Sequence, residues 1–357
     1  MSNEICDTAS SDSSGPTGDS VGERRDSPML SAMTVIDISQ QLPGPYASGL
    51  LAELGANVVK VEPPQGEPAR SLDPQMFALV NSHKRVINLD LKTSVGVKYL
   101  HELVARADVF IEGFRPGVAE RLGAGWPVLS GINPGLVYCS ISASGQHGPY
   151  SNVPMHDLNL QGLAGIDTGL GIGVPWVDLG TATTAALAIS AAWQAAVASG
   201  RGHFLDIAML DTAVLWRRVK AGAVGRREPT YDIFSTADNS RVAIAILEDH
   251  IWFRLCHAFR WDDWLASTDF KSYLDRLTAS EVIHQRLTEA CLALRLDELL
   301  SLAREYDLPL TPVGPVLEGE AAIQLSERGL DDKNKRQFPL PVGVEVVAGF
   351  TRGGGKQ

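Results

Sequence analysis

The segment MTVIDISQQLPGPYASGLLAELGANVVKVE, residues 33–62, decides the fold class. It begins with a β-branched apolar run, Met33–Ser39, which predicts a strand and ends in the turn-rich sequence LPGPY. A helical pattern over Ala47–Leu54 stops at Gly55, and Val58–Glu62 is the next apolar run. Nearly continuous apolar strands separated by a helix are typical of βαβ units in a buried parallel sheet.

The same alternation continues through the first two hundred residues. Arg85–Leu91, Val109–Glu112 and Leu136–Ser142 predict further strands, and Val95–Arg106 predicts an amphipathic helix. We expect Leu136–Ser142 to be the last strand of this half. The sequence therefore predicts an α/β fold with a large domain built around a parallel sheet.

The composition changes after Arg227. Tyr231–Leu247 predicts two antiparallel strands joined at the Asp238-Asn239-Ser240 turn, and helical patterns continue to about Tyr306. The termini are rich in Ser and Gly without an apolar face, which predicts disorder. The expected parts are a disordered extension over 1–31, a large domain over 32–225, a small α+β domain over 226–306, a return segment over 307–345 and a flexible tail over 346–357.

Bulk properties exclude several classes of protein. A net charge of −11 argues against a nucleic-acid partner. The four cysteines lie far apart without a CxxC pair, which predicts reduced buried thiols and no metal site; they are Cys6, Cys139, Cys256 and Cys291.

One uncharged segment, Leu179–Ser199, is long enough to span a bilayer. It is mostly alanine, so we predict a buried helix there, with a helix at a subunit interface as the alternative. The first residues contain no apolar region of the kind found in signal peptides. We therefore expect a cytoplasmic protein with no membrane partner.

Six blocks of sequence carry a resemblance to a known family. They are Val35–Glu62, Lys84-Arg85, LDLK at Leu89–Lys92, ADVFIEGFRPGVAERLG at Ala107–Gly123, INPGLVYCSIS at Ile132–Ser142 and GQHGPY at Gly145–Tyr150. Their order and spacing resemble family III CoA-transferases, a group that includes the carnitine and formyl-CoA transferases and the α-methylacyl-CoA racemases. LTPVGPVLE near residue 315 is similar more loosely.

The resemblance implies a fold and an assembly. The large domain is expected to be Rossmann-like, and two chains are expected to interlock as a homodimer. The active site then lies where the large domain of one chain meets the small domain of the other. No permanently bound cofactor is implied, because coenzyme A enters as part of the substrate.

Met155–Leu160, MHDLNL, is the segment that bears on the reaction. The matching stretch of the racemases has a His-Asp pair followed by Asn two positions on, as His156, Asp157 and Asn159 do here. In the transferases the Asp is the nucleophile that forms an acyl anhydride, and the His is usually another residue. Gln161 is more usual in the transferases, so the segment keeps both reactions open.

Asp178 matches the position of the second base of the racemases. Racemisation removes an α-proton from one face of the thioester and returns a proton to the other, so His156 and Asp178 are the expected pair of bases. A dry pocket would raise the pKa of Asp178, and backbone amides around Asp157–Asn159 are the expected donors to the enolate oxygen. The resemblance also implies that Met155, Asn159 and Leu160 contact the substrate.

Each of these residues has a structural alternative. His156 is on its own more often a hydrogen-bonded structural histidine. Asp157 would serve equally as the N-cap of the helix that follows it, and Asp178 as the cap of the alanine-rich helix.

The resemblance implies that coenzyme A binds against three short segments: Leu89, Asp90, Leu91 and Lys92; Gly113, Phe114 and Arg115; and Arg121. Lysine and arginine there suit phosphate groups.

Two departures from the family pattern stand out. Pro63 replaces a phosphate-binding arginine, at a cost of about 1.5–3 kcal/mol unless Lys60 or Arg70 substitutes. Gly225–Thr230 lacks the glycine-rich loop that covers the acyl-enzyme in transferases.

Three functions follow, in order of preference. The first is α-proton transfer on a 2-methylacyl-CoA-like thioester by His156 and Asp178. The second is a CoA-transferase that uses Asp157 as its nucleophile. The third is an acyl-CoA-binding scaffold without turnover, or a family member adapted to a different pathway reaction.

Overall fold

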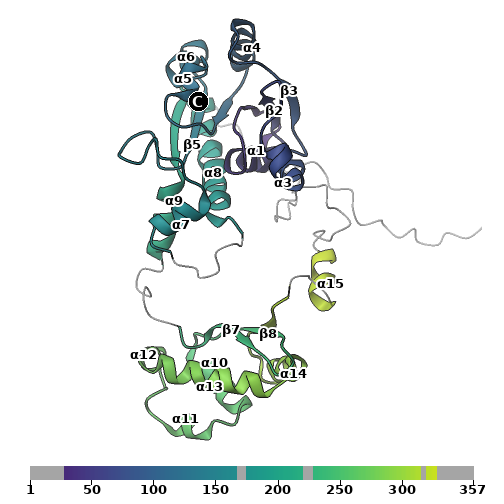
Figure 1. Cartoon of the computed structure of the whole chain (residues 1–357), viewed down its shortest axis with the longest axis vertical. Helices are drawn as coiled ribbons and strands as arrows, with labels where there is room; N and C mark the ends of the chain where they lie inside the picture. Colours follow the sequence, from purple (N-terminus) through teal and green to yellow (C-terminus); the bar gives the residue numbers. More distant parts are fainter. Residues whose placement is uncertain (1–27, 167–173, 220–227, 315–318, 328–357) are drawn as a thin grey trace, which may run out of the picture.

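The computed structural model describes residues 28–166, 174–219, 228–314 and 319–327. Figure 1 shows a large domain with helices around a central sheet and a smaller domain with a sheet of its own. The glycine-containing segment at residues 169–173, most of the predicted N-terminal extension and the predicted C-terminal tail lie outside the described residues.

The large domain contains a six-stranded parallel sheet in the order β3-β2-β1-β4-β5-β6. This is the strand order of the Rossmann fold, as expected from the sequence. The order reverses between β1 and β4, and ligands of such sheets bind beyond the carboxyl ends of the strands at that point. The strands are β1 (Thr34–Asp37), β2 (Asn57–Glu62), β3 (Arg85–Asn88), β4 (Val109–Glu112), β5 (Val137–Ser142) and β6 (His203–Ala208).

Helices cover both faces of this sheet because both faces are apolar. Alternate strand residues point to opposite sides. Val35 packs with helices α1 (Pro43–Glu53) and α8 (Trp176–Ser199), whereas its neighbour Ile36 packs against α4 (Ser94–Val104) and α6 (Trp126–Ile132). The other described elements of this domain are the 3₁₀ turn Pro28–Leu30, α2 (Ala69–Leu72), α3 (Pro74–Val80), α5 (Val118–Arg121), α7 (Asp157–Leu163) and α9 (Met209–Val219).

The predicted buried helix at Leu179–Ser199 is α8, but only one of its faces is buried. Ala185 and Ile189 are fully enclosed in the core, whereas Leu187 is 72% exposed and Val197 66%. Small alanine side chains let α8 lie close to α1 and the sheet. Among the described helices, none is long and apolar enough to cross a membrane.

The strand β6 was not predicted, because we expected β5 to be the last strand of this half. Its burial alternates along the chain, unlike the continuous burial of β5, since it forms the edge of the sheet. Gly200, at φ 70°, ends α8 before it. A Cβ atom on Gly202 would lie 2.2 Å from the carbonyl oxygen of Leu136, so only glycine permits this close approach.

The small domain contains a three-stranded antiparallel sheet, and its first two strands are the predicted hairpin. They are β7 (Tyr231–Ser235) and β8 (Arg241–Ala245), and Asn239 in the turn has a φ of 59°. The third strand, β9 (Leu310–Pro312), pairs with β8. It therefore belongs to the small sheet, which corrects its assignment to the return segment.

Five helices pack on this sheet around a core rich in tryptophan. Trp252, Trp261 and Trp264 are buried together there. The helices are α10 (Asp249–Ala258), α11 (Asp262–Ala266), α12 (Tyr273–Thr278), α13 (Ser280–Ala293) and α14 (Leu296–Tyr306); α15 (Gly319–Glu327) follows β9.

Three of the four cysteines are described, and all three are buried free thiols, as predicted. Burial raises the pKa values of Cys256 and Cys291 to about 12, so both remain protonated at neutral pH. Within the described residues, no three metal-ligating side chains come together.

Candidate functional site

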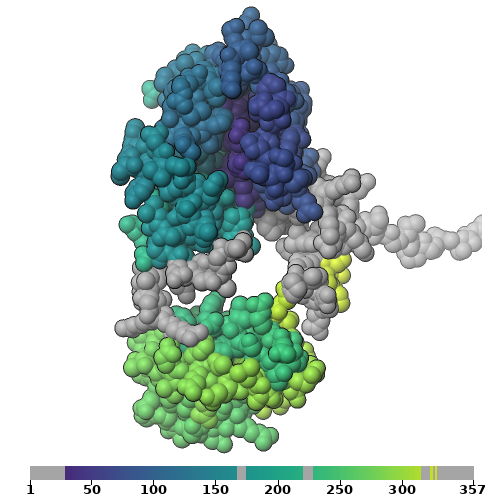
Figure 2. Space-filling view, viewed as in Figure 1, coloured from purple at the N-terminus to yellow at the C-terminus, as the bar shows by residue number. Residues whose placement is uncertain are grey.

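A cavity of about 240 Å³ opens at the carboxyl ends of β1, β4 and β5, the switch point of the sheet. In Figure 2 the purple N-terminal residues of the large domain lie at the bottom of a furrow between blue and teal segments. The described residues that line the cavity are Gln40, Gln41, Pro43, Gly44, Gly113, Phe114, Arg115, Ile141, Ser142, Ala143, Ser151, Val153, Pro154, Met155, His156, Asp178 and Met209.

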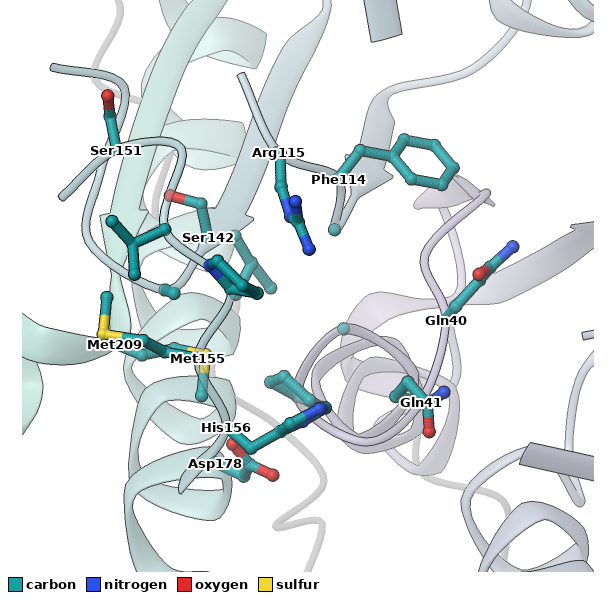
Figure 3. Close-up of a pocket in the computed structure, with 17 residues that line it drawn as sticks. Gln40, Gln41, Phe114, Arg115, Ser142, Ser151, Met155, His156, Asp178 and Met209 are labelled. Atoms are coloured by element: carbon teal, nitrogen blue, oxygen red, sulfur yellow. The ribbon is translucent and has the colours of Figure 1, made fainter. Parts of the chain in front are cut away.

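His156 lines this cavity from the beginning of α7 (Figure 3). It is the residue before the first helical position, with extended backbone angles. Its backbone N–H donates to Oδ1 of Asn159 at 3.0 Å, which is half of a capping box. Asn159, predicted to contact the substrate, is not among the cavity-lining residues and instead fixes the backbone of His156.

Asp178 lines the same cavity from the first turn of α8, beside His156 (Figure 3). Burial, and then the negative charge of Asp157, raise the pKa of Asp178 to about 7. Both protonation states are therefore populated near neutral pH. The expected role of Asp178 as a helix cap is not found, because Pro175 occupies the N-cap position.

Asp157 lies beside the cavity, and its carboxylate is occupied by hydrogen bonds. Oδ1 accepts from the backbone N–H of Val177 at 2.8 Å and of Asp178 at 3.0 Å. Oδ2 accepts from the side-chain amide of Gln161. Asp157 thus caps a helix, as the structural alternative held, but the helix is α8 rather than the α7 in which it lies.

The remaining residues of the MHDLNL segment divide between cavity and core. Met155 lines the cavity. Leu160 does not line the cavity. It is fully buried and packs α7 against the core of the large domain.

A second hollow of about 520 Å³ adjoins the cavity and contains part of the predicted coenzyme A site. It is lined by Gly113, Phe114 and Arg115, which it shares with the cavity, and by Arg121. Its other lining residues are Pro116, Val118 and Asn152. Four of the residues predicted to bind coenzyme A are therefore brought together.

The predicted segment at Leu89–Lys92 lies between β3 and α4 and lines neither hollow among the described residues. Leu89 and Leu91 pack against the core of the large domain. Asp90 accepts a hydrogen bond from the backbone N–H of Lys92, whose side chain is exposed. Binding of coenzyme A by this segment stays a prediction.

Lys60 and Arg70 do not replace the cation that is missing at Pro63. The ammonium of Lys60 is fully buried and lies 2.8 Å from Oε2 of Glu67. The guanidinium of Arg70 forms a two-pronged pair with the carboxylate of Glu62, at 2.7 and 2.9 Å. Both cations are already paired within the protein, so neither is a free phosphate ligand.

The polar residues of the cavity that sequence reasoning missed include Gln40 and Gln41. They follow β1, and the end of the first strand beside the switch point is where a Rossmann sheet places ligand-binding residues. Their position directly after the first predicted strand was therefore the signal that could have identified these two residues. The segment Gly225–Thr230, which lacks the glycine-rich loop, lies partly outside the described residues, because these do not include residues 220–227.

Comparison with known proteins places these features in a family. A family model described as CoA-transferase family III matches residues 30–348. The chain is 29% identical over 327 residues to acetyl-CoA:oxalate CoA-transferase of Acetobacter aceti, with 84% of each chain covered. It is 33% identical over 322 residues to succinyl-CoA:mesaconate CoA-transferase of Haloarcula hispanica, with 80% of each covered.

Solved structures agree with this result. A CAIB/BAIF family protein of Brucella suis superposes with a TM-score of 0.72 at 27% identity, over 85% of this chain and 89% of the other. Rv3272 of Mycobacterium tuberculosis gives a TM-score of 0.72 at 30% identity, over 80% and 82%. The chain belongs to CoA-transferase family III.

Proposed function

We propose that the protein moves the α-proton of an acyl-CoA thioester, as a racemase or epimerase of a 2-methylacyl-CoA-like substrate. The observation that carries this proposal is that His156 and Asp178 line one cavity, while Asp157 does not. Two groups able to exchange protons thus lie beside the hollow that contains Arg115 and Arg121, where the nucleotide end of the substrate would bind.

The reaction uses one base and one acid in each direction. The imidazole of His156 removes the α-proton from one face of the substrate, and the electron pair of the broken C–H bond delocalises onto the thioester oxygen. The protonated carboxyl of Asp178 then donates its proton to the opposite face, which restores the C–H bond with inverted configuration. In the reverse direction the carboxylate of Asp178 is the base and the imidazolium of His156 is the acid.

The environment of Asp178 suits this exchange. A carboxyl group with a pKa of about 7 is protonated often enough to act as an acid and ionised often enough to act as a base. Asp157 assists without touching the substrate, because its hydrogen bonds hold the first turn of α8, which carries Asp178. The donors to the enolate oxygen, expected at the beginning of α7, stay a prediction.

A second candidate function is CoA transfer between carboxylates. The names of the curated relatives favour it, since they include oxalate, succinate–glutarate and mesaconate CoA-transferases. In that reaction an oxygen of Asp157 attacks the thioester carbonyl, the C–S bond breaks and the thiolate of coenzyme A leaves. The attacking oxygen would first have to lose a hydrogen bond, either from Gln161 or from the amides of α8.

Proton NMR in deuterated water separates the two candidates. The protein is incubated with a single enantiomer of a 2-methylacyl-CoA, and a carboxylate acceptor is added to a parallel sample. We expect deuterium at the α-carbon without acceptor, and loss of that signal in His156→Ala when the enantiomer is the one whose α-proton faces His156. Acceptor-dependent formation of a new thioester without exchange would instead identify a transferase. Absence of both reactions would contradict both candidates and leave a binding scaffold.

The interlocked homodimer is part of the same proposal. The described residues that line the cavity all belong to the large domain, and the family resemblance assigns the other side of the active site to the small domain of a second chain. Light scattering coupled to size-exclusion chromatography checks this assembly, and a monomer at the concentration of the assay would contradict it.

A further inference from the structure

Gln40 and Gln41 form a polar wall of the cavity that the proposed reaction does not use. In Figure 3 they lie across the cavity from His156 and Asp178. Both glutamines are partly buried. Their side-chain amide atoms are not among the buried atoms that lack a partner, so they are accessible from the cavity.

Among the described residues, other glutamines near the cavity are hydrogen-bonded within the protein, and these two are not. The amide of Gln161 donates to Asp157, and that of Gln146 donates to Ser140 at 2.8 Å. Within the part of the chain that the structure describes, neither Gln40 nor Gln41 has a side-chain hydrogen-bond partner. Their donors and acceptors are thus available to a molecule in the cavity.

The backbone places both side chains on the same wall. Gln41 has a φ of 66°, in the left-handed region that residues other than glycine adopt at a cost. In an extended strand, consecutive side chains point to opposite faces. The left-handed conformation interrupts that alternation, so the two consecutive glutamines Gln40 and Gln41 both line the cavity.

Buried contacts hold this loop in place. Ser39, the residue before the glutamines, donates its backbone N–H to Oδ1 of Asp37 at 2.9 Å. Its carbonyl oxygen accepts from Nζ of Lys60 at 2.9 Å. On the far side of the loop, a Cβ on Gly44 would lie 2.2 Å from Oγ of Ser39. Local strain persists where the surrounding structure enforces it, as here, and such sites are often functional.

We propose that Gln40 and Gln41 select acyl-CoA thioesters whose acyl group carries a hydroxyl or carbonyl oxygen beyond the α-carbon. The inference rests on the proposed function, because the acyl-CoA must occupy this cavity. The reacting carbon has to approach His156 and Asp178, and a substituent on the opposite side of that carbon then extends towards the wall that Gln40 and Gln41 line.

The chemistry of the wall favours a neutral oxygen. Each amide offers an N–H donor and a C=O acceptor, which match a hydroxyl or a ketone. Among the described residues that line the cavity, Arg115 is the only lysine or arginine, and it lies on the wall shared with the coenzyme A hollow. A second carboxylate in the acyl group would therefore meet amides rather than a cation at Gln40 and Gln41.

Isothermal titration calorimetry with three probes tests this selection without requiring turnover. The probes are butanoyl-CoA, 3-hydroxybutanoyl-CoA and succinyl-CoA. We expect the hydroxylated thioester to bind on the order of tenfold more tightly than butanoyl-CoA, the effect of about one neutral hydrogen bond, and more tightly than succinyl-CoA. The double variant Gln40→Met/Gln41→Met should bind the first two equally.

Two further variants control for folding and for the substitution itself. Gln41→Gly accepts a positive φ without strain and removes the amide, so it should fold and show a reduced preference. Gln75→Met changes an exposed glutamine on α3 and should retain the full preference.

The outcomes separate this inference from the proposed function. Equal binding of the first two probes by the wild type, preference for succinyl-CoA, or an unchanged preference in the double variant would overturn the inference. If α-deuterium exchange is still observed in that case, the proposed function stands. A preference that depends on the glutamines without any exchange would support the inference and reject the proposed reaction. If no probe binds, both fall.

Discussion

Two acidic side chains at the carboxyl edge of the same sheet, Asp37 and Asp178, have opposite electrostatic surroundings. Burial acts to raise the pKa of Asp37, but Lys60 and Lys84 and the hydroxyls of Ser39 and Ser48 hold it well below the usual range. Asp178 is partly buried, and its charged neighbour is the carboxylate of Asp157, so burial and this charge raise its pKa to about 7.

The difference shows how one sheet edge serves both stability and chemistry. Asp37 stays ionised near neutral pH and is paired with Lys84. Its hydrogen bond from Ser39 fixes the loop after β1, and it does not transfer a proton near neutral pH. Among the described residues no cation pairs with Asp178, which faces a cavity, so it can gain and lose a proton near neutral pH. Burial alone does not distinguish a structural carboxylate from a reactive one; the sign of the neighbouring charge does.

The largest expected effect concerns Asp178, the carboxyl group that lines the cavity. In Asp178→Asn, inversion of a 2-methylacyl-CoA should fall by about 100- to 10,000-fold, because the second proton-transfer group is lost. His156 should still exchange the α-proton of the one enantiomer whose proton faces it. Chiral chromatography measures inversion, and NMR in deuterated water measures exchange for each enantiomer.

His156→Ala is the mirror control for this experiment. It should lose inversion to a similar extent and retain exchange only of the other enantiomer. Equal exchange of both enantiomers by either single variant would contradict a two-base mechanism.

Substitution of Asp37, the carboxylate paired with lysine, should lower the free energy of unfolding. Replacing Asp37 by Asn leaves Lys84, whose side chain is completely buried, without its anion at 3.2 Å. Breaking a buried pair typically costs about 3–5 kcal/mol in the free energy of unfolding. Urea denaturation monitored by tryptophan fluorescence measures the loss. Asp263→Asn is the matched control, because Asp263 pairs with Arg286 at the surface and should lose far less.

Asp37→Asn should also remove part of the loss of stability that the wild type shows at acidic pH. The folded pKa of Asp37 lies below its unfolded value, so the unfolded state binds the proton first as the pH falls. Asp37 therefore stabilises the wild type above about pH 4, and this contribution is lost progressively below that pH. An Asp37→Asn curve with the same acid slope as the wild type would show that other carboxylates account for it.

Much of the large domain was predictable because its signals are local. The apolar runs at Val58–Glu62 and Val109–Glu112 coincide with β2 and β4, as buried parallel strands should. The edge strand β6 was missed because it is only half buried. The strand β9 was misassigned because its partner, β8, lies far away in the sequence and leaves no local pattern.

The candidate site was predicted in part, and the errors have a common cause. Two separate segments identified His156 and Asp178, and both residues do line one cavity. The sequence could not show that Asp157 caps α8, because the contact joins residues twenty positions apart. It also could not show that the two cations proposed to replace the arginine missing at Pro63 already form ion pairs with Glu62 and Glu67.

The smallest expected effect tests the link between the two carboxylates of the cavity region. In Asp157→Asn, the amide oxygen can still accept from the backbone of Val177 and Asp178, so the beginning of α8 should be retained. The negative charge disappears, and with it the second cause of the raised pKa of Asp178; burial, the larger cause, remains. The limb of the pH–rate profile that reports Asp178 should therefore move to lower pH but stay above the usual aspartate range. Asp211→Asn, an exposed residue on α9, should leave the profile unchanged. Complete loss of activity at every pH in Asp157→Asn, with the fold intact, would instead assign Asp157 the role of the nucleophile and favour CoA transfer over proton transfer.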